Sequence, residues 1–394
     1  MSTPFTLIRN ANVYAPEPLG LQDVLMAGGK IVALGSSLAS WLSPLQAAEA
    51  EVVDANGQLL IPGLVDPLVH ISGGGGEGGF HTRTPAMQLT DATLGGVTTV
   101  IAALGTDATT RTLPDLLAKA YALRTEGMSA YCYTGSYEVP VRTITGSVRD
   151  DIVLIEPFIG VGEIAISDHR SSQPSTAELA RIAADARVAG MLAGKAGITF
   201  VHVGDGERLL TPLEELVQTT ELKRSQFYAT HINRHRTLLE AGFTFAKAGG
   251  YIDFTTSTTP ELLAAGEISA AAALAEGLRS GVPATCMSMS SDGNASLPEF
   301  NAAGDLVGLQ VGRVQSLFES AREAVGLGVS WTDAVRAVAT NAAQILKLHH
   351  KGVIAVGVDA DVVLLNVEHE IDSVWARGEL MVQGGQARRF GAFG

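Results

Sequence analysis

Five side chains able to bind a divalent metal stand at or near the ends of apolar, strand-like runs: His70, Glu163, His202, His231 and Asp292. Imidazole nitrogens and carboxylate oxygens are the ligands that Zn²⁺ and similar ions take in proteins. Each residue alone has a simpler interpretation. A strand-end histidine is often only hydrogen-bonded, Asp292 precedes a glycine as turn aspartates do, and Glu163 could form an internal ion pair. Their common position at strand ends favours a shared metal site.

The elements that must position these side chains alternate between apolar strands and helices through the middle of the chain. Alternation predicts parallel strands, and eight strands predict a closed (β/α)₈ barrel of the TIM type, an α/β fold. Such barrels gather functional groups at the carboxyl ends of their strands. The predicted strands are 64–70, 97–104, 130–137, 158–166, 198–203, 227–232, 251–255 and 285–291, and the clearest helices are 114–126, 175–193, 212–221 and 306–326.

Both ends of the chain consist of short β segments and turns. Near the N-terminus, Asp23–Met26 and Ile31–Leu34 flank a Gly28-Gly29 turn and predict a hairpin. Residues 361–365, 371–377 and 379–382 repeat this texture near the C-terminus. We therefore expect a small β-sandwich domain built from residues 1–61 and 351–394, with the barrel occupying 62–350.

The charge balance excludes some partners. The chain has 27 basic and 41 acidic residues and a net charge of −14, without basic runs, which disfavours binding to nucleic acid or to an anionic membrane. No apolar run approaches the ~20 residues of a membrane span, and the N-terminus lacks the pattern of a signal peptide. A cytoplasmic protein is the expectation.

Several segments together resemble the isoaspartyl (β-aspartyl) dipeptidases of the amidohydrolase superfamily, and the resemblance covers nearly the whole chain. The four-glycine run with glutamate and the Ile-Ser-Asp-His-Arg string are the most specific of them. The segments are Pro62-Gly63-Leu64-Val65-Asp66, Gly73–Gly79, Thr82-Arg83-Thr84-Pro85, Gly105-Thr106-Asp107, Thr143–Ser147, Ala165–Arg170, Thr230–Arg234 and Ser291-Asp292-Gly293-Asn294.

Two positions depart from the family pattern. The first strand usually carries His-x-His, but here it reads Leu68-Val69-His70, and leucine cannot bind a metal. Many relatives place a carboxylated lysine on the fourth strand, where this chain has Glu163. Glutamate also offers two anionic oxygens and is a plausible bridge between two metals. Glu163, His202 and His231 then make one full Zn²⁺ site, whereas His70, Glu163 and Asp292 make a second site that is one ligand short.

The resemblance implies hydrolysis of the isopeptide amide of β-aspartyl dipeptides by metal-bound water, with Asp292 as the general base and Tyr137 as the group that stabilises the oxyanion. It also implies a homo-oligomer. An isoaspartyl dipeptide carries two carboxylates and one ammonium, so Arg170 and Arg234 are candidates to bind the carboxylates and Glu77 to bind the ammonium. Further substrate hydrogen bonds are implied for the backbone of Gly75 and for Thr106 and Ser296.

Two alternatives stay open at this point. The first is another amide or cyclic-amide hydrolase of the superfamily, such as a dihydroorotase or a hydantoinase-like enzyme, against which Glu77 and the Arg170/Arg234 pair argue. The second is a catalytically impaired paralogue, because Leu68 replaces an expected ligand. Retention of Asp292 and Tyr137 argues against the second.

Overall fold

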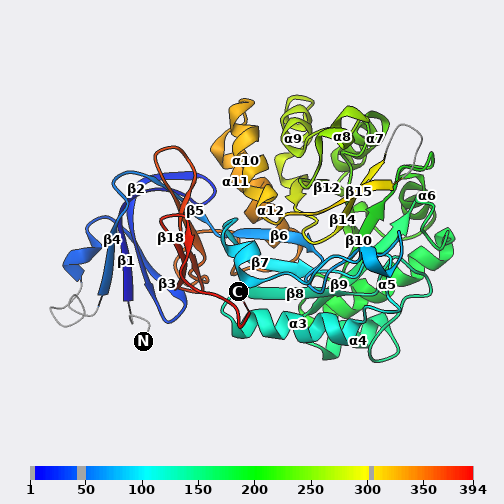
Figure 1. Cartoon of the computed structure of the whole chain (residues 1–394), viewed down its shortest axis with the longest axis horizontal. Helices are drawn as coiled ribbons and strands as arrows, with labels where there is room; N and C mark the ends of the chain where they lie inside the picture. Colours follow the sequence, from blue (N-terminus) through cyan, green and yellow to red (C-terminus); the bar gives the residue numbers. More distant parts are fainter. Residues whose placement is uncertain (1–4, 42–49, 301–305, 394) are drawn as a thin grey trace.

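Eight parallel strands form the centre of the molecule in the computed structural model, which describes residues 5–41, 50–300 and 306–393 (Figure 1). Their order in the sheet is their order in the chain, and a bridge between Val69 and Gly293 brings the first strand against the end of the last. The predicted barrel is confirmed. The strands are β6 (Leu64–Val69), β7 (Val97–Ala102), β8 (Ser129–Thr134), β9 (Phe158–Ile166), β10 (Ile198–Val203), β11 (Phe227–Thr230), β12 (Tyr251–Thr255) and β13 (Met287–Ser290).

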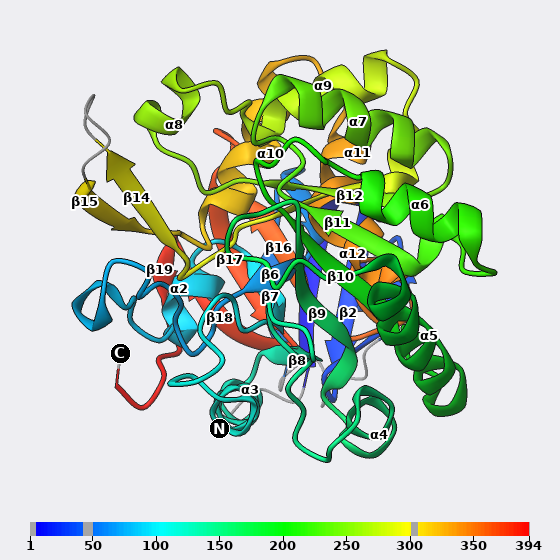
Figure 2. The same ribbon diagram turned by 90° about the vertical axis from the view of Figure 1, so that its right-hand side faces the viewer.

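Helices surround these strands, as Figure 2 shows in a view at right angles to Figure 1. Most begin at a serine or threonine whose side-chain oxygen accepts a backbone N–H of the first turn, and Ser175 and Glu178 form a reciprocal capping box at the longest one. The helices are α2 (Leu89–Thr93), α3 (Leu113–Thr125), α4 (Val148–Leu154), α5 (Thr176–Ala193), α6 (Thr211–Thr219), α7 (Arg236–Lys247), α8 (Pro260–Ala264), α9 (Ala270–Arg279), α10 (Ser316–Gly326), α11 (Trp331–Val335) and α12 (Asn341–Ile345).

Strands from both ends of the chain form a separate sheet beside the barrel (Figure 1). Its pairings are mostly antiparallel, and the predicted hairpin around Gly28-Gly29 is confirmed as β2 paired with β3. The indole of Trp375 is buried in its core with Ile8 and Leu60. The strands are β1 (Phe5–Tyr14), β2 (Pro18–Ala27), β3 (Lys30–Gly35), β4 (Ala50–Asp54), β5 (Leu59–Pro62), β16 (Val362–Leu365), β17 (Ile371–Ala376), β18 (Glu379–Gln383) and β19 (Gln386–Ala387).

One predicted helix is wrong in its first part. The helix expected over 306–326 begins only at Ser316, and Leu306–Val311 is instead β15, paired antiparallel with β14 (Ser296–Phe300). Cross-strand pairing with β14 overrides the local helical pattern. The resulting hairpin follows the last barrel strand directly and reaches the functional pocket described below. Among the described residues, no helix has the length and apolarity needed to cross a membrane.

Candidate active site

Glu163, His202 and His231 converge at the carboxyl end of the barrel from three adjacent strands. All three are buried, and their ligand atoms lie within 4.8 Å of one another. Oε1 of Glu163 is 3.5 Å from Nδ1 of His202 and 3.4 Å from Nε2 of His231. Neither oxygen of Glu163 has a hydrogen-bond partner within the part of the chain that the structure describes. A buried carboxylate without such partners is costly unless a cation or a proton occupies the space.

The charge of Glu163 agrees with a cation site. Burial alone would raise the pKa of this carboxyl, but the adjacent His202 and His231 outweigh burial and hold its pKa below the ordinary value. The group is therefore anionic at neutral pH. Two imidazoles and one anionic carboxylate fit a catalytic Zn²⁺ or a similar ion, since they leave room for water or substrate. The predicted first metal site is thus assembled geometrically.

Each histidine is oriented by a second contact on its other ring nitrogen. These contacts fix which nitrogen faces Glu163, as outer partners of metal-binding histidines usually do. The contacts are Nδ1 of His70 with the carbonyl of Ala103 at 3.2 Å, Nε2 of His202 with Oδ2 of Asp168 at 2.9 Å, and Nδ1 of His231 with Oγ1 of Thr255 at 2.6 Å.

His70 and Asp292 lie on the other side of Glu163. Nε2 of His70 is 3.1 Å from Oδ1 of Asp292 and 3.7 Å from Oε2 of Glu163. Leu68 does not extend this group with a ligand, because its side chain is fully buried in an apolar cluster that includes Ala103 and Tyr133. The predicted second site therefore has the residues expected of it and remains one protein ligand short.

Backbone strain accompanies this cluster. His231 has φ 64° and Asp292 has φ 51°, in the left-handed region that residues with a Cβ seldom adopt. Both residues come just after a barrel strand, His231 after β11 and Asp292 after β13. Such conformations persist where the surrounding structure imposes them, often at functional sites. They turn the imidazole and the carboxylate toward the pocket.

Tyr137 lies beside the cluster. Its hydroxyl is 2.6 Å from Nδ1 of His202, the same nitrogen that faces Glu163. Burial, the largest cause, together with the charge of Glu163 raises the pKa of Tyr137 well above its usual value. The phenol therefore keeps its proton and can donate a hydrogen bond.

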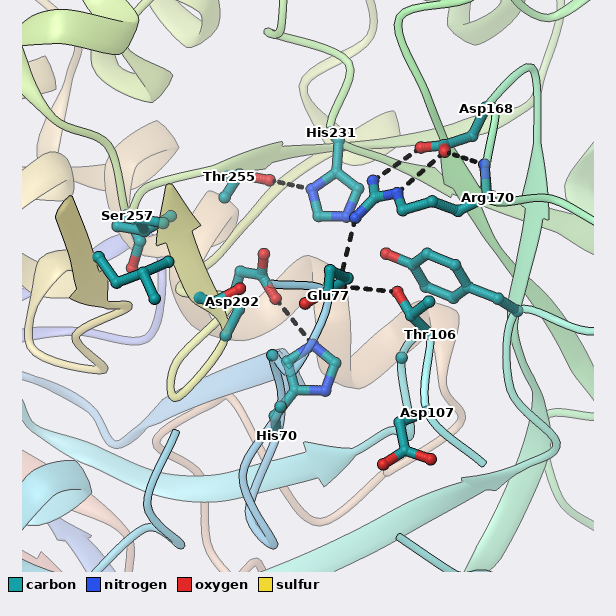
Figure 3. Close-up of a pocket in the computed structure, with 18 of the residues that line it drawn as sticks. His70, Glu77, Thr106, Asp107, Asp168, Arg170, His231, Thr255, Ser257 and Asp292 are labelled. Atoms are coloured by element: carbon teal, nitrogen blue, oxygen red, sulfur yellow. Dashed lines mark hydrogen bonds and ion pairs between the residues drawn. The ribbon is translucent and has the colours of Figure 1, made fainter. Parts of the chain in front are cut away.

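A pocket of about 620 Å³ opens over these groups (Figure 3). It brings together every residue predicted for substrate binding, with Glu163 and His202 just outside its lining. The predicted residues that line it are His70, Gly75, Glu77, Thr106, Tyr137, Arg170, His231, Arg234, Asp292 and Ser296. Leu262, Leu297 and Leu309 add an apolar wall from α8 and the β14–β15 hairpin.

Opposite charges meet at one part of this pocket. Nη1 of Arg170 is 3.5 Å from Oε1 of Glu77, and Thr106 donates a hydrogen bond of 2.9 Å to the same oxygen. The other edge of the guanidinium is held by Asp168, with Nε 3.0 Å from Oδ1 and Nη2 2.8 Å from Oδ2. Arg234 is less engaged, since its buried Nε meets no hydrogen-bond partner among the described residues.

Two further residues of this region were not predicted as site residues. Asp168 belongs to the Ile-Ser-Asp-His-Arg segment. Its position two residues before Arg170 is the sequence feature that could have identified it as a site residue. Arg111 is buried and donates to the carbonyls of Gly74 and Thr84, at 3.0 and 2.9 Å, and to that of Ser72. It thereby holds the glycine-rich loop that carries Glu77, and no pattern in the sequence marks this role.

Residues 59–381 match the model of the amidohydrolase family. The structure of a β-aspartyl dipeptidase from Fervidobacterium islandicum AW-1, in complex with β-Asp-Leu, is 44% identical in sequence, covers 99% of both chains and has a TM-score of 0.91. A second structure of β-aspartyl dipeptidase from the same organism is 43% identical, covers 98% of this chain and 99% of that one, and has a TM-score of 0.88.

More distant relatives share less. A dihydropyrimidinase from Brevibacillus agri covers 98% of this chain and 97% of its own with a TM-score of 0.66, but it is 18% identical, which shows the fold alone. A dihydroorotase from Halalkalibacterium halodurans is 39% identical over 111 residues, or 28% of this chain and 23% of that protein. The chain thus matches only about a quarter of the length of that curated relative.

Proposed function

Because this chain belongs to the amidohydrolase family, and over its whole length resembles β-aspartyl dipeptidase structures, we propose that it is a metal-dependent hydrolase of β-aspartyl dipeptides. One arrangement supports this function above others. The Glu77–Arg170 pair lies in the same pocket as His231 and Asp292, next to the buried carboxylate of Glu163.

Glu163, His202 and His231 would hold the ion, which we propose to be Zn²⁺. A divalent ion at this position polarises a carbonyl and lowers the pKa of a bound water from 15.7 toward ~7. The orientation of both imidazoles, by Asp168 and Thr255, leaves the required nitrogen facing Glu163 without further movement. His70 would complete only a weaker second position.

Asp292 is the proposed general base. Burial opposes its ionisation, but the hydrogen bond and charge of His70, with the charge of His231, hold its pKa below the ordinary value. The carboxylate is therefore anionic, faces the pocket and can take the proton of the attacking water. The same oxygen can then give that proton to the departing amine.

Tyr137 is the proposed donor to the carbonyl oxygen of the substrate, where negative charge develops during attack. Its phenol is neutral and buried, and a donor placed in advance in a dry site stabilises such charge strongly. When Nδ1 of His202 is otherwise engaged, the hydroxyl is free to turn toward the substrate.

The β-linkage of the peptide bond in the substrate is the reason for assigning Glu77 and Arg170 to substrate binding. In a β-aspartyl peptide the free α-ammonium and the free α-carboxylate are attached to the same carbon. Glu77 and Arg170, whose Oε1 and Nη1 lie 3.5 Å apart, present the two complementary charges side by side. In an α-aspartyl peptide the α-carboxylate is consumed in the peptide bond, so the pair would be only half satisfied. Arg234, whose Nε has no hydrogen-bond partner among the residues that the structure describes, is the proposed partner of the carboxylate of the leaving residue.

The test is release of leucine from β-aspartyl-leucine, α-aspartyl-leucine and, in parallel, ring opening of L-dihydroorotate, each with metal-stripped and zinc-supplemented enzyme. We expect zinc-dependent cleavage of the β-linked peptide alone. Ring opening of dihydroorotate without cleavage of the β-linked peptide would support the cyclic-amide alternative instead. If no substrate is turned over, but Leu68→His restores β-aspartyl cleavage, the native chain is an impaired paralogue.

A homo-oligomeric, cytoplasmic enzyme without nucleic-acid or membrane partners is part of the same proposal.

A further inference from the structure

Asp168 contacts both halves of the proposed site at once. It lies in the turn after β9 and is almost fully buried. Its Oδ2 is 2.9 Å from Nε2 of His202 and 2.8 Å from Nη2 of Arg170. Its Oδ1 accepts Nε of Arg170 at 3.0 Å and the backbone N–H of Arg170 at 2.8 Å. Each carboxylate oxygen thus has two donors, which leaves no free acceptor position for substrate.

Toward His202, this contact selects a tautomer. A carboxylate on Nε2 favours the form in which Nε2 carries the proton, so the lone pair lies on Nδ1. Nδ1 is the nitrogen that faces Glu163 at 3.5 Å. Asp168 therefore presents His202 in the form that a metal ligand requires.

Toward Arg170, the contact fixes the direction of the guanidinium. The Nε–Nη2 edge is bound in bidentate fashion, so Nη1 is left to face Glu77 and the pocket. A planar, rigid fork held along one edge has little freedom to rotate. The position of Nη1, on which recognition of a carboxylate depends, is thus set by Asp168.

The backbone beneath Asp168 is also confined. A Cβ on Gly204 would lie 2.5 Å from Cβ of Asp168 and 2.5 Å from the carbonyl oxygen of Ser167, so only glycine allows this approach. The turn after β9 is pressed against the segment that follows β10, the strand that carries His202. If Arg170 moved and Asp168 moved with it, the contact between Asp168 and His202 would therefore change as well.

We propose that Asp168 is a positioning residue that couples the proposed metal site to recognition of the amino-acid end of the substrate, through His202 on one side and Arg170 on the other. Its role toward Arg170 rests on the proposed function, whereas its role toward His202 rests only on the metal site.

The test compares Asp168→Asn with wild-type enzyme, and Asp185→Asn, which removes a carboxylate paired with Arg149 outside the pocket, is the matched control. Asp168→Ala is made alongside, because it removes both carboxylate oxygens, whereas the amide of Asn keeps one oxygen acceptor. Zinc affinity is measured by competition with a chromogenic chelator, without substrate. Then kcat and KM for β-aspartyl-leucine are measured at stoichiometric and at excess zinc.

For Asp168→Asn we expect zinc affinity to fall 10- to 100-fold, as for other outer partners of metal-binding histidines. Excess zinc should restore most of kcat but leave KM raised by roughly tenfold, because Arg170 stays misplaced. Asp185→Asn should change neither value. A purely structural role would instead lower the unfolding temperature of the metal-free protein without this split between kcat and KM.

The outcomes separate the two proposals. The proposed coupling is overturned if zinc affinity is unchanged in both Asp168 variants. It is also overturned if KM is raised but returns to the wild-type value at excess zinc. If wild-type enzyme cleaves no β-aspartyl peptide, the proposed function fails, while the zinc competition still decides whether Asp168 positions His202.

Discussion

Oε1 of Glu77 lies 3.5 Å from Nη1 of Arg170, so that a carboxylate and a guanidinium meet inside the pocket, with Thr106 bound to the same oxygen (Figure 3). The pair is partly exposed and is therefore worth little as a stabilising contact. We propose that the pair instead binds a ligand that carries an ammonium and a carboxylate on the same carbon.

Glu77→Gln should reduce the ability of the enzyme to recognise the substrate ammonium. Wild-type enzyme is expected to prefer β-aspartyl-leucine over succinyl-leucine, which lacks only the amino group, by ~100-fold in kcat/KM. In the variant this preference should fall below about tenfold, chiefly through loss of activity on the aspartyl substrate. Glu156→Gln, on an exposed acid elsewhere, is the control. An unaltered preference in Glu77→Gln would assign the ammonium to another group.

We expect Leu68 to limit the number of metal ions that the protein binds. Wild-type protein dialysed against zinc should keep about one ion per chain, and Leu68→His should keep about two, by supplying the missing ligand. The imidazole would replace a side chain in an apolar cluster, so the metal-free variant should lose about 2 kcal/mol of unfolding free energy. Leu68→Gln, polar but a poor ligand, should lose stability without gaining metal. Two tightly held ions in the wild-type protein would contradict this.

Tyr137→Phe removes a hydroxyl and little else. If the phenol donates to the developing oxyanion, kcat for β-aspartyl-leucine should fall by ~10²- to 10³-fold with little change in KM. Zinc affinity should be kept, because the ring nitrogens of His202 are still oriented by Asp168. Tyr131→Phe, on the strand β8 that precedes Tyr137 but outside the pocket, is the control. A rise in KM alone would make Tyr137 a binding group instead.

The buried carboxyl of Asp66, on strand β6, leads us to expect that the free energy of unfolding depends on pH. Burial, only partly offset by hydrogen bonds from Ser291, raises the pKa of Asp66 to about 7. A raised folded-state pKa means that the unfolded chain loses this proton first. The contribution is thus fully present below about pH 4 and is lost as pH rises toward 7.

Urea unfolding of the metal-free protein at pH 5 and pH 8 measures this effect. Between these values wild type should lose stability relative to Asp66→Asn, by at most about 3 kcal/mol. Asp205→Asn should run parallel to wild type. Parallel curves for Asp66→Asn as well would show that Asp66 titrates normally.

Much of the barrel could be predicted because its strands are continuous apolar runs bounded by turns. The strands β9, β10 and β12 have the predicted bounds. Such runs are buried on both faces, so local composition and tertiary structure agree. The segment 306–311 differs, since its pairing with β14 depends on a partner strand that its own sequence does not reveal.

The candidate ligands could be predicted for a related reason. Four of them stand at or just after the end of a strand and Glu163 lies in the second half of β9, and the barrel brings these strand ends together. The residues that orient the ligands could not be predicted. His231 contacts Thr255 and His202 contacts Asp168, at separations of 24 and 34 residues, through side chains of ordinary type. Only the closed barrel shows that these pairs meet. The roles proposed for Glu77, Arg170 and Arg234 rest on the family resemblance and on the charges of the substrate, and not on spacing.

The sheet made from both chain ends has a consequence for biosynthesis. β5 hydrogen-bonds to β1 on one side and to β16 on the other, with Ile61 opposite Val363. During translation, β5 is therefore an open strand edge until the ribosome has added the residues of β16, some 300 positions later. A transcript cut short before that point yields a chain whose exposed edge invites aggregation. The edge of β5 is thus covered only after the ribosome has synthesised the whole barrel and then β16.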